Sequence, residues 1–403
     1  MKDSILETAK DPAVVDYQAI FEPNVGLTEF RKQLVSHRVF AQCEQDILRR
    51  VASPGGASVL SVVGPTGVGK TQLLNEVATV LSKSPDPQPS PIANDAIQPY
   101  LPVVCVIAPT GLTFQSRFRG LLLEILKKVN PALADAGVVR VDQGSARRRR
   151  QSLSGASIAM LEELTRTGLR ERRTRAVLID EGQHLSLSAN AQEWRMAAES
   201  LKLLGSVSGT LIVLFGTWEL LCLPNLSGQL GRRTKAIHMR RYLWNVPEDR
   251  AVFEDVVKLI AQAWPAVLPE RLLLDNLRLI YAGCVGCVGI LFDWLHDAVG
   301  LAKGRAVTLD MLFETTFPEQ RLRKFDSEAR QCEDAFKREE GGLVRFAAEL
   351  CAPTTGGNSS STTSATIVQR FQGPAKARTR RGVHRNPTYD PYNPKQRPAP
   401  TAS

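Results

Sequence analysis

A glycine-rich octapeptide has the residue types and the spacing needed to hold a chain of phosphates. Residues 64–71 read Gly-Pro-Thr-Gly-Val-Gly-Lys-Thr and follow an apolar run at 59–63. In such a loop the glycines let backbone N–H groups curl around phosphate oxygens, the lysine reaches the β- and γ-phosphates, and the last hydroxyl holds Mg²⁺. The pattern therefore predicts a nucleotide site formed by Gly64, Pro65, Thr66, Gly67, Val68, Gly69, Lys70 and Thr71, with Thr71 also a metal ligand.

Two adjacent acids supply the second chemical feature. Asp180 and Glu181 directly follow the apolar run at 176–179. At the carboxyl end of a strand, Asp180 can orient the water shell of Mg²⁺ and bind with the nucleotide, while Glu181 can polarise the attacking water. The chain has no N-K-x-D element of the kind that reads guanine, so we expect ATP and Mg²⁺ as cofactors and hydrolysis of ATP to ADP and phosphate.

Three more residues are candidates for completing the catalytic centre. Thr217 follows the apolar run at 211–215, where a polar side chain can hold the water or sense the γ-phosphate. Arg232 and Arg233 precede the last predicted strand, and an arginine there reaches a neighbour's γ-phosphate in ring-forming ATPases. A strand-capping role for Thr217 and a plain surface role for either arginine stay open as alternatives.

The elements that position these residues form an alternating pattern. Apolar runs that predict five strands occur at 59–63, 103–107, 176–179, 211–215 and 236–239. Helical patterns fall between them, including 72–81, 114–129 and 157–167. Continuous apolar strands suit a sheet covered on both faces, so the sequence predicts an α/β fold with a five-stranded parallel sheet flanked by helices.

Composition divides the chain into four parts. We expect an N-terminal extension at 1–27, the nucleotide-binding core at 28–245, a helical lid with a helical extension at 246–350, and a tail at 351–403. Helices are predicted at 248–264, 271–282, 289–302 and 319–340. Residues 352–403 hold eight basic residues and one acid among many prolines and serines, which predicts a disordered basic tail. Both a solubilising end and a tether that touches DNA or a partner fit this tail.

The overall charge, the lack of long apolar runs and the cysteines indicate the kind of partner and the cellular compartment to expect. The net charge of +10 favours a polyanionic partner. No apolar run of about 18 residues appears and the N-terminus has no apolar leader, so we expect a cytoplasmic protein without a membrane span. Seven scattered cysteines suit reduced thiols. Cys284 and Cys287 form an isolated C-x-x-C pair, which we interpret as two small apolar helix residues rather than a zinc site.

Three segments in order resemble the AAA+ ATPases that regulate DNA transposition, of the TnsC/TniB type, and more distantly the B protein of phage Mu. They are GPTGVGKT at 64–71, LIDEGQHL at 178–185 and FGTWELLCLPNLSGQLGRRTKAIHMRRY at 215–242, the first two being the Walker A and Walker B motifs. The resemblance implies an AAA+ fold and an ATP-dependent selector of target DNA in the bacterial cytosol. Such a protein forms a ring or helical filament on double-stranded DNA, recruits and activates the transposase, responds to a target-site adaptor protein, and disassembles on ATP hydrolysis.

One feature of the lid departs from this family, and the residues that would contact DNA have only weak candidates in the sequence. Many AAA+ lids carry a second-sensor arginine near the start of their third helix, and the corresponding stretch at 286–291 has none. An assembly around a duplex needs polar or basic groups on its inner loops, for which Thr113, Arg117 and Arg119 are the candidates. A solvated helix face is the alternative for these three, and a solvated loop is the alternative to a phosphate-contacting element for the four arginines at 147–150.

The motifs leave two other functions open. The first is a nucleotide-gated scaffold that binds ATP without hydrolysing it at a significant rate. The second is a secretion or signalling AAA+ ATPase with no role on DNA. Measuring ATP turnover with and without DNA distinguishes the scaffold from a hydrolysing regulator. Measuring ATP-dependent DNA binding distinguishes the secretion or signalling ATPase from a regulator that acts on DNA.

Overall fold

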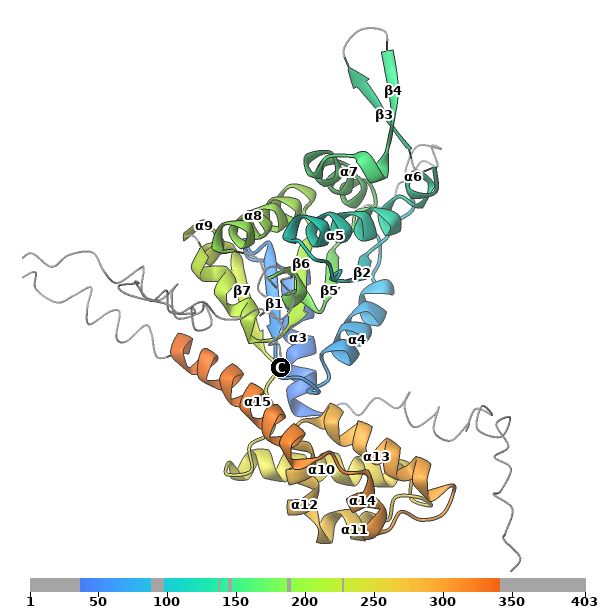
Figure 1. Cartoon of the computed structure of the whole chain (residues 1–403), viewed down its shortest axis with the longest axis vertical. Coiled ribbons are helices and arrows are strands. Elements are labelled where there is room, and N and C mark those ends of the chain that lie inside the picture. The colour runs from blue at the N-terminus through green and yellow to red at the C-terminus, as the bar shows by residue number, and fades with distance from the viewer. Residues whose placement is uncertain are drawn as a thin grey trace, which may run out of the picture. The chain divides into compact units, whose positions relative to one another are not determined.

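A computed structural model describes residues 37–87, 98–136, 138–143, 147–186, 190–226 and 228–340 (Figure 1). The predicted N-terminal extension at 1–27, the start of the core at 28–36 and the tail at 351–403 lie outside these residues. Among the helices of the described ranges, no single one is long and apolar enough to cross a membrane, although Leu277–Cys284 and Val288–Ala302, bent by 109°, together meet the criteria of length and composition.

The core of the fold is a five-stranded parallel sheet with the strand order β2-β5-β6-β1-β7. The strands are β1 (Val59–Val63), β2 (Val103–Ile107), β5 (Ala176–Asp180), β6 (Leu211–Gly216) and β7 (Thr234–His238). Neighbouring strands that are parallel need crossover connections, and helices supply them. The predicted α/β class and the five strands are confirmed, with the last strand beginning two residues earlier than expected.

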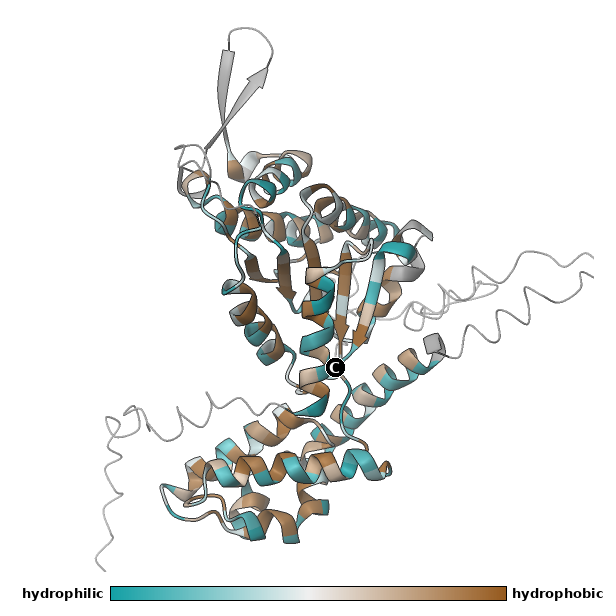
Figure 2. Ribbon diagram, turned by 180° about the vertical axis from the view of Figure 1, so that it is seen from behind, coloured by the Kyte–Doolittle hydropathy of each residue, from teal (hydrophilic) through white to brown (hydrophobic). Residues whose placement is uncertain are grey.

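Two hydrophobic clusters cover the two faces of the sheet. Successive residues of β1 alternate between them, since Leu60 and Val62 belong to one cluster while Val59 and Val63 belong to the other. This follows from the period of two along a strand. Figure 2 shows the strands as mainly hydrophobic, whereas the surrounding helices mix both classes of residue. The sheet is therefore buried on both sides, as continuous apolar strands require.

Helices α3 (Arg38–Ala52) and α4 (Lys70–Ser82) contribute to the first cluster, and α5 (Phe114–Val129), α7 (Ile158–Glu171) and α8 (Ala191–Ser208) to the second. The sequence left α8 unassigned. It begins with a capping box in which Asn190 and Glu193 satisfy each other's backbone N–H groups. Three short segments complete this part of the chain. After β5 comes η2 (Gly182–Leu185), after β6 comes η3 (Trp218–Leu226), and α9 (Gly228–Arg233) leads into β7.

The polar segment after α5 contains regular structure that the sequence analysis missed. It forms α6 (Pro131–Ala136), the antiparallel strands β3 (Val138–Gln143) and β4 (Arg147–Ser152), and the single turn η1 (Leu153–Gly155). Residues 147–150, for which the sequence left a solvated loop and a phosphate-contacting element open, belong to one strand of a two-stranded ribbon. The sequence pattern did not predict this strand, because four consecutive arginines lack the alternation of apolar and polar residues that is typical of a strand.

Only helices follow β7 in the described chain. They are α10 (Pro247–Ala263), α11 (Glu270–Asp275), α12 (Leu277–Cys284), α13 (Val288–Ala302), α14 (Leu309–Thr315) and α15 (Glu319–Glu340). One helix predicted at 271–282 is divided at Asn276, whose side chain donates to the carbonyl oxygen of Leu272 at 2.9 Å. Asparagine competes with the helical backbone in this way.

The C-x-x-C pair forms the turn between α12 and α13. Cys284 ends α12, but Cys287 is the residue before α13, so the prediction of two helix residues is wrong for Cys287. Gly286 has a φ of 77°, and a Cβ there would come within 2.2 Å of the Tyr242 carbonyl oxygen. Burial raises the pKa of both thiols, to about 12 for Cys287. Among the described residues no cluster of His, Cys, Asp and Glu could hold a metal ion.

Candidate functional site

The phosphate loop joins the carboxyl end of β1 to the start of α4. Gly67 and Gly69 have φ angles of 74° and 103°, in the region that favours glycine. A Cβ on Gly64 would approach the Met239 carbonyl oxygen to 2.4 Å. Since α4 begins at Lys70, the free N–H groups of its first turn face the loop, and this is the arrangement that binds phosphate.

Lys70 is partly buried within this loop. Its Nζ donates to the carbonyl oxygens of Gly64 at 3.0 Å and Pro65 at 2.9 Å. Burial lowers the pKa of Lys70, and the carboxylates of Glu181 and Asp180 partly oppose that shift. The ammonium group is therefore held at the mouth of the loop with two acids close enough to act on it.

Thr71 and Asp180 meet as the sequence predicts. The Thr71 hydroxyl donates to Asp180 Oδ2 at 2.8 Å, and the Glu181 N–H donates to Asp180 Oδ1 at 2.9 Å. A hydroxyl and a carboxylate oxygen side by side are suitable partners for Mg²⁺, which keeps several waters and takes few protein ligands. The residues present thus fit a magnesium-bound triphosphate.

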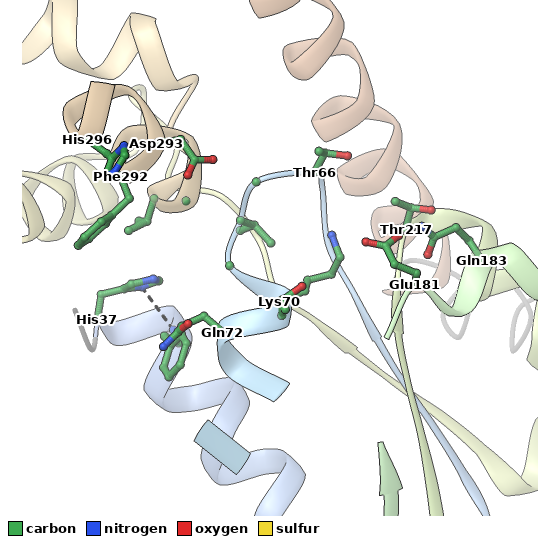
Figure 3. Close-up of a pocket in the computed structure, with 17 residues that line it drawn as sticks. His37, Thr66, Lys70, Gln72, Glu181, Gln183, Thr217, Phe292, Asp293 and His296 are labelled. Carbon is green, nitrogen blue, oxygen red and sulfur yellow. Dashed lines mark hydrogen bonds between the residues drawn. The ribbon is translucent and has the colours of Figure 1, made fainter. Parts of the chain in front are cut away.

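Glu181 and Thr217 face the same space from neighbouring strands (Figure 3). Glu181 has a φ of 53°, a left-handed conformation that is unfavourable for a residue with a side chain. Its carboxylate accepts a hydrogen bond from Gln183 Nε2 at 2.5 Å, and the Thr217 hydroxyl donates to Glu219. Gln183 and Glu219 are additions to the predicted set, and each holds a predicted catalytic side chain.

Glu181, Gln183 and Thr217, together with residues 66–71, line a cavity of about 620 Å³, which is the size of a small-molecule site. Gln72 and Gln183, which adjoin the motifs, also line it and were not predicted. The sequence analysis also missed the part of the lining that is far from the motifs in the chain: His37, Phe40, Val288, Gly289, Phe292, Asp293 and His296. Figure 3 shows His37 and Phe292 on the side of the loop away from Glu181. No local pattern marks these residues, because they come together only when α3 and α13 pack around the loop.

The start of α13 is attached to the phosphate loop. Ile290 N–H donates to the Gly67 carbonyl oxygen at 3.1 Å, and a Cβ on Gly289 would come within 2.5 Å of that oxygen. Asp293 and His296, from the next turn of α13, reach the cavity. The sequence of α13 has no arginine, in agreement with the missing second-sensor arginine.

His37 closes the other side of the cavity. Its Nδ1 lies 2.8 Å from the Tyr242 hydroxyl, and burial lowers the pKa of His37 to about 4. The imidazole is therefore neutral at pH 7 and pairs with Tyr242 as a neutral ring. Phe40, one turn into α3, lines the cavity beside it.

Arg232 and Arg233 lie at the other end of the sheet. They end α9, and Ser58 N–H, just before β1, donates to the Arg233 carbonyl oxygen at 3.0 Å. The phosphate loop follows the far end of β1, so one strand length of about 17 Å separates them. They are therefore too far from the phosphate loop of their own chain to reach a nucleotide bound there. Both arginines are exposed.

The three predicted DNA contacts have structural roles in the structure. Arg117 is only 2% exposed and donates to the Gly111 carbonyl oxygen at 2.6 Å, so its guanidinium is not accessible to a duplex. Arg119 donates to the carbonyl oxygens of Leu153, at 2.8 Å, and Ala156. Thr113 is exposed and caps α5 by accepting from the Ser116 N–H at 3.2 Å. The geometry therefore disagrees with the prediction for Arg117 and gives the other two residues a different task.

Comparison with known proteins agrees with this geometry. Residues 52–222 match the family described as AAA domain. Comparison with curated proteins gives no match. Solved structures that are similar include domain III of the replication initiation protein DnaA from Thermotoga maritima, with 16% identity, a TM-score of 0.41, and coverage of 71% of this chain and 94% of that chain.

Two further similar structures are Cdc6p from Pyrobaculum aerophilum and the Drosophila ORC bound to DNA. Cdc6p has 17% identity and a TM-score of 0.46, and covers 72% of this chain and 69% of its own. The ORC chain has 16% identity and a TM-score of 0.45, with coverage of 78% and 70%. The sheet order, the phosphate loop and the family match together show that the chain has the AAA+ fold and carries an AAA-type P-loop ATPase domain.

Proposed function

We propose that the protein hydrolyses Mg²⁺-ATP and uses this reaction to control its assembly on double-stranded DNA as a regulator of transposition. The observation that carries the ATPase part is that Lys70, Thr71 and Glu181 line one cavity, while Asp180 accepts the Thr71 hydroxyl beside it. The transposition part is supported by the segment 215–242, which resembles the TnsC/TniB-type regulators.

Each side chain of the site has a task in this proposal. Lys70 and the N–H groups at the start of α4 bind the phosphates, and Thr71 with Asp180 orients the metal and its waters. The metal supplies charge stabilisation for the transferred phosphoryl group. Glu181 orients the attacking water and takes up its proton, and Thr217 holds that water from the neighbouring strand.

A second protomer completes the site. Arg232 and Arg233 are exposed at the opposite end of the sheet from the phosphate loop of their own chain. An arginine that stabilises transition-state charge must come within hydrogen-bond distance of the γ-phosphate. Hydrolysis therefore requires a homo-oligomer, a ring or a helical filament, in which one protomer's arginine reaches the next protomer's nucleotide.

The β3–β4 ribbon is the proposed DNA-contacting element in place of Arg117. Its register pairs Arg140 with Arg150 and Asp142 with Arg148. The two strands together hold five arginines and one acid, so the ribbon carries net positive charge. Such a ribbon fits the phosphate backbone of a duplex and gives salt-sensitive binding with little sequence preference.

Arg119 is the residue that anchors this ribbon. Its guanidinium donates to the carbonyl oxygens of Leu153 and Ala156, which directly follow β4. Leu153 is 7% exposed and Ala156 is 1% exposed, so the base of the ribbon is fixed in the core. The recruited transposase and the target-site adaptor remain part of the proposal through the family resemblance alone.

Binding of a duplex by the full chain at low salt, with ATP, ADP or no nucleotide, tests the function. We expect tight binding with ATP only, and loss of it in Lys70→Ala. The control is Lys83→Ala, which removes an exposed lysine from the other end of α4. DNA binding that is the same in all three nucleotide states would contradict the proposal, and ATP turnover without DNA binding would favour a secretion or signalling ATPase.

A further inference from the structure

Helix α15 crosses the phosphate side of the cavity. The Thr66 hydroxyl, at the tip of the phosphate loop, donates to Glu328 Oε2 of α15 at 3.1 Å. Figure 3 shows this helix beside Thr66. A carboxylate that contacts the loop is unexpected, because it places negative charge beside a site built for phosphates.

The contact belongs to an extended packing surface. Ala329, Cys332 and Phe336 recur at helical spacing and are 0%, 1% and 9% exposed. The Phe336 ring stacks on the His238 imidazole with ring centres 4.0 Å apart and planes inclined by 9°. His238 ends β7, so α15 is packed against the sheet as well as against the loop.

Buried ion pairs fix α15 in this position. Arg241 is 5% exposed, and its guanidinium donates to Asp326 Oδ1 and Glu333 Oε1, each at 2.7 Å. It also donates to the Val285 carbonyl oxygen at 3.2 Å, in the turn before α13. Burial by itself would lower the pKa of Arg241, but the hydrogen bonds to Glu333 and Asp326 outweigh it and raise the pKa. One arginine thus ties α15 to the exit of β7 and to the lid.

The same helix reaches the catalytic side of the cavity. It contacts η3, where Glu219 accepts the Thr217 hydroxyl. Burial raises the pKa of the Cys332 thiol to about 12, with Lys70 opposing the rise and Glu219 adding to it. Cys332 is 1% exposed on the packed face of α15, and Glu328 lies one turn earlier on the same helix.

We propose that Glu328 is a specificity-determining residue that disfavours a third phosphate while α15 is docked on the loop. The inference rests on the proposed ATP site and adds a residue that discriminates between ATP and ADP. The Glu328 carboxylate and the γ-phosphate carry like charges, so a bound triphosphate favours release of Glu328 from Thr66. The coupling is reciprocal, so docking of α15 on the loop weakens the binding of ATP more than the binding of ADP.

The test measures binding of a non-hydrolysable ATP analogue and of ADP, both with Mg²⁺, to full-length variants by calorimetry. Glu328→Gln removes the charge and keeps an oxygen that accepts the Thr66 hydrogen bond. We expect the analogue to bind about threefold to tenfold more tightly and ADP to be affected by less than about twofold. Glu319→Gln is the matched control, since it makes the same charge change on α15 at a side chain that is 75% exposed and paired with Arg323.

A second variant separates charge from docking. Phe336→Leu loosens the stack on His238 without changing the charge of α15, and it should also favour the analogue over ADP. Equal effects on the two nucleotides, or none, in Glu328→Gln would overturn the discrimination by Glu328. An unchanged preference in Phe336→Leu would overturn its link to docking. Wild-type protein that binds neither nucleotide would contradict the proposed ATP site and this inference together. The outcomes above, in which wild-type protein binds both nucleotides, would overturn the inference alone.

Discussion

The hydroxyl of Thr71 donates a hydrogen bond to the carboxylate of Asp180 at 2.8 Å, although 109 residues separate them in the chain. The other oxygen of that carboxylate accepts the N–H of Glu181. Asp180 is thus fixed from both sides, and the backbone at Glu181 is turned so that its side chain enters the cavity. One carboxylate thus positions both Thr71, a proposed metal ligand, and Glu181, the proposed base.

Glu181→Gln is expected to separate binding from hydrolysis. The amide is nearly isosteric and keeps the contact with Gln183, but it cannot take a proton from water, so turnover should fall by about 10² to 10⁴. ATP affinity should change little, and the protein should stay on DNA. Steady-state turnover and DNA dissociation rates measure this, with Glu163→Gln on the exposed side of α7 as control. Turnover that survives the change would favour a different base, and wild-type protein without significant turnover would favour the non-hydrolysing scaffold.

If a neighbouring protomer supplies the arginines, two inactive variants should complement each other. Arg232→Ala/Arg233→Ala should bind ATP normally and lose turnover by about 10³ or more, because transition-state charge is no longer compensated. Lys70→Ala cannot hold ATP but still offers its arginines. Turnover should therefore reappear when the two proteins are mixed. Lys235→Ala, an exposed cation on the same sheet end, is the control. A mixture as inactive as its components would contradict the arrangement in trans.

The ribbon predicts the salt dependence of DNA binding. Each lost phosphate contact lowers the slope of log K against log salt by about 0.9. Arg148→Gln/Arg150→Gln should reduce the slope by about 2 and leave ATP affinity unchanged, since neither arginine belongs to the phosphate loop or to the acids at 180–181. The comparison is Arg271→Gln/Lys324→Gln, which removes two exposed charges from the lid. If both pairs alter the slope equally, the ribbon has no special role.

His37 should make stability depend on pH. Its folded pKa is lowered to about 4 by burial, whereas the unfolded value is close to 6.5. The unfolded state therefore binds the proton first, and the contribution of His37 is fully present above pH 6.5 and is lost as the pH falls towards 4. In that window the free energy of unfolding should decrease by up to about 1.4 kcal/mol per pH unit from this residue. Urea denaturation between pH 7.5 and 5 should show a shallower decline in His37→Gln.

The sequence by itself predicted those features whose structure or chemistry depends on a short, continuous segment of the chain. A strand that is buried on both faces needs an unbroken apolar run, so all five strands of the sheet could be located before their order was known. The loop at 64–71 and the acids at 180–181 are likewise local patterns, since their chemistry depends on residue type and on the strand end that carries them. Helix α15 was predicted with its observed limits for the same reason.

Only the tertiary structure decided which side chains meet. Arg117, Arg119 and the arginines of β4 are equally basic in the sequence, yet the first is buried, the second holds η1, and the last belong to a ribbon. Likewise, nothing near Glu328 in the chain indicates that its carboxylate contacts Thr66. Residue type fixes the charge and the hydrogen-bonding capacity of a side chain, but its partner is set by packing between elements far apart in sequence, and packing leaves no local pattern.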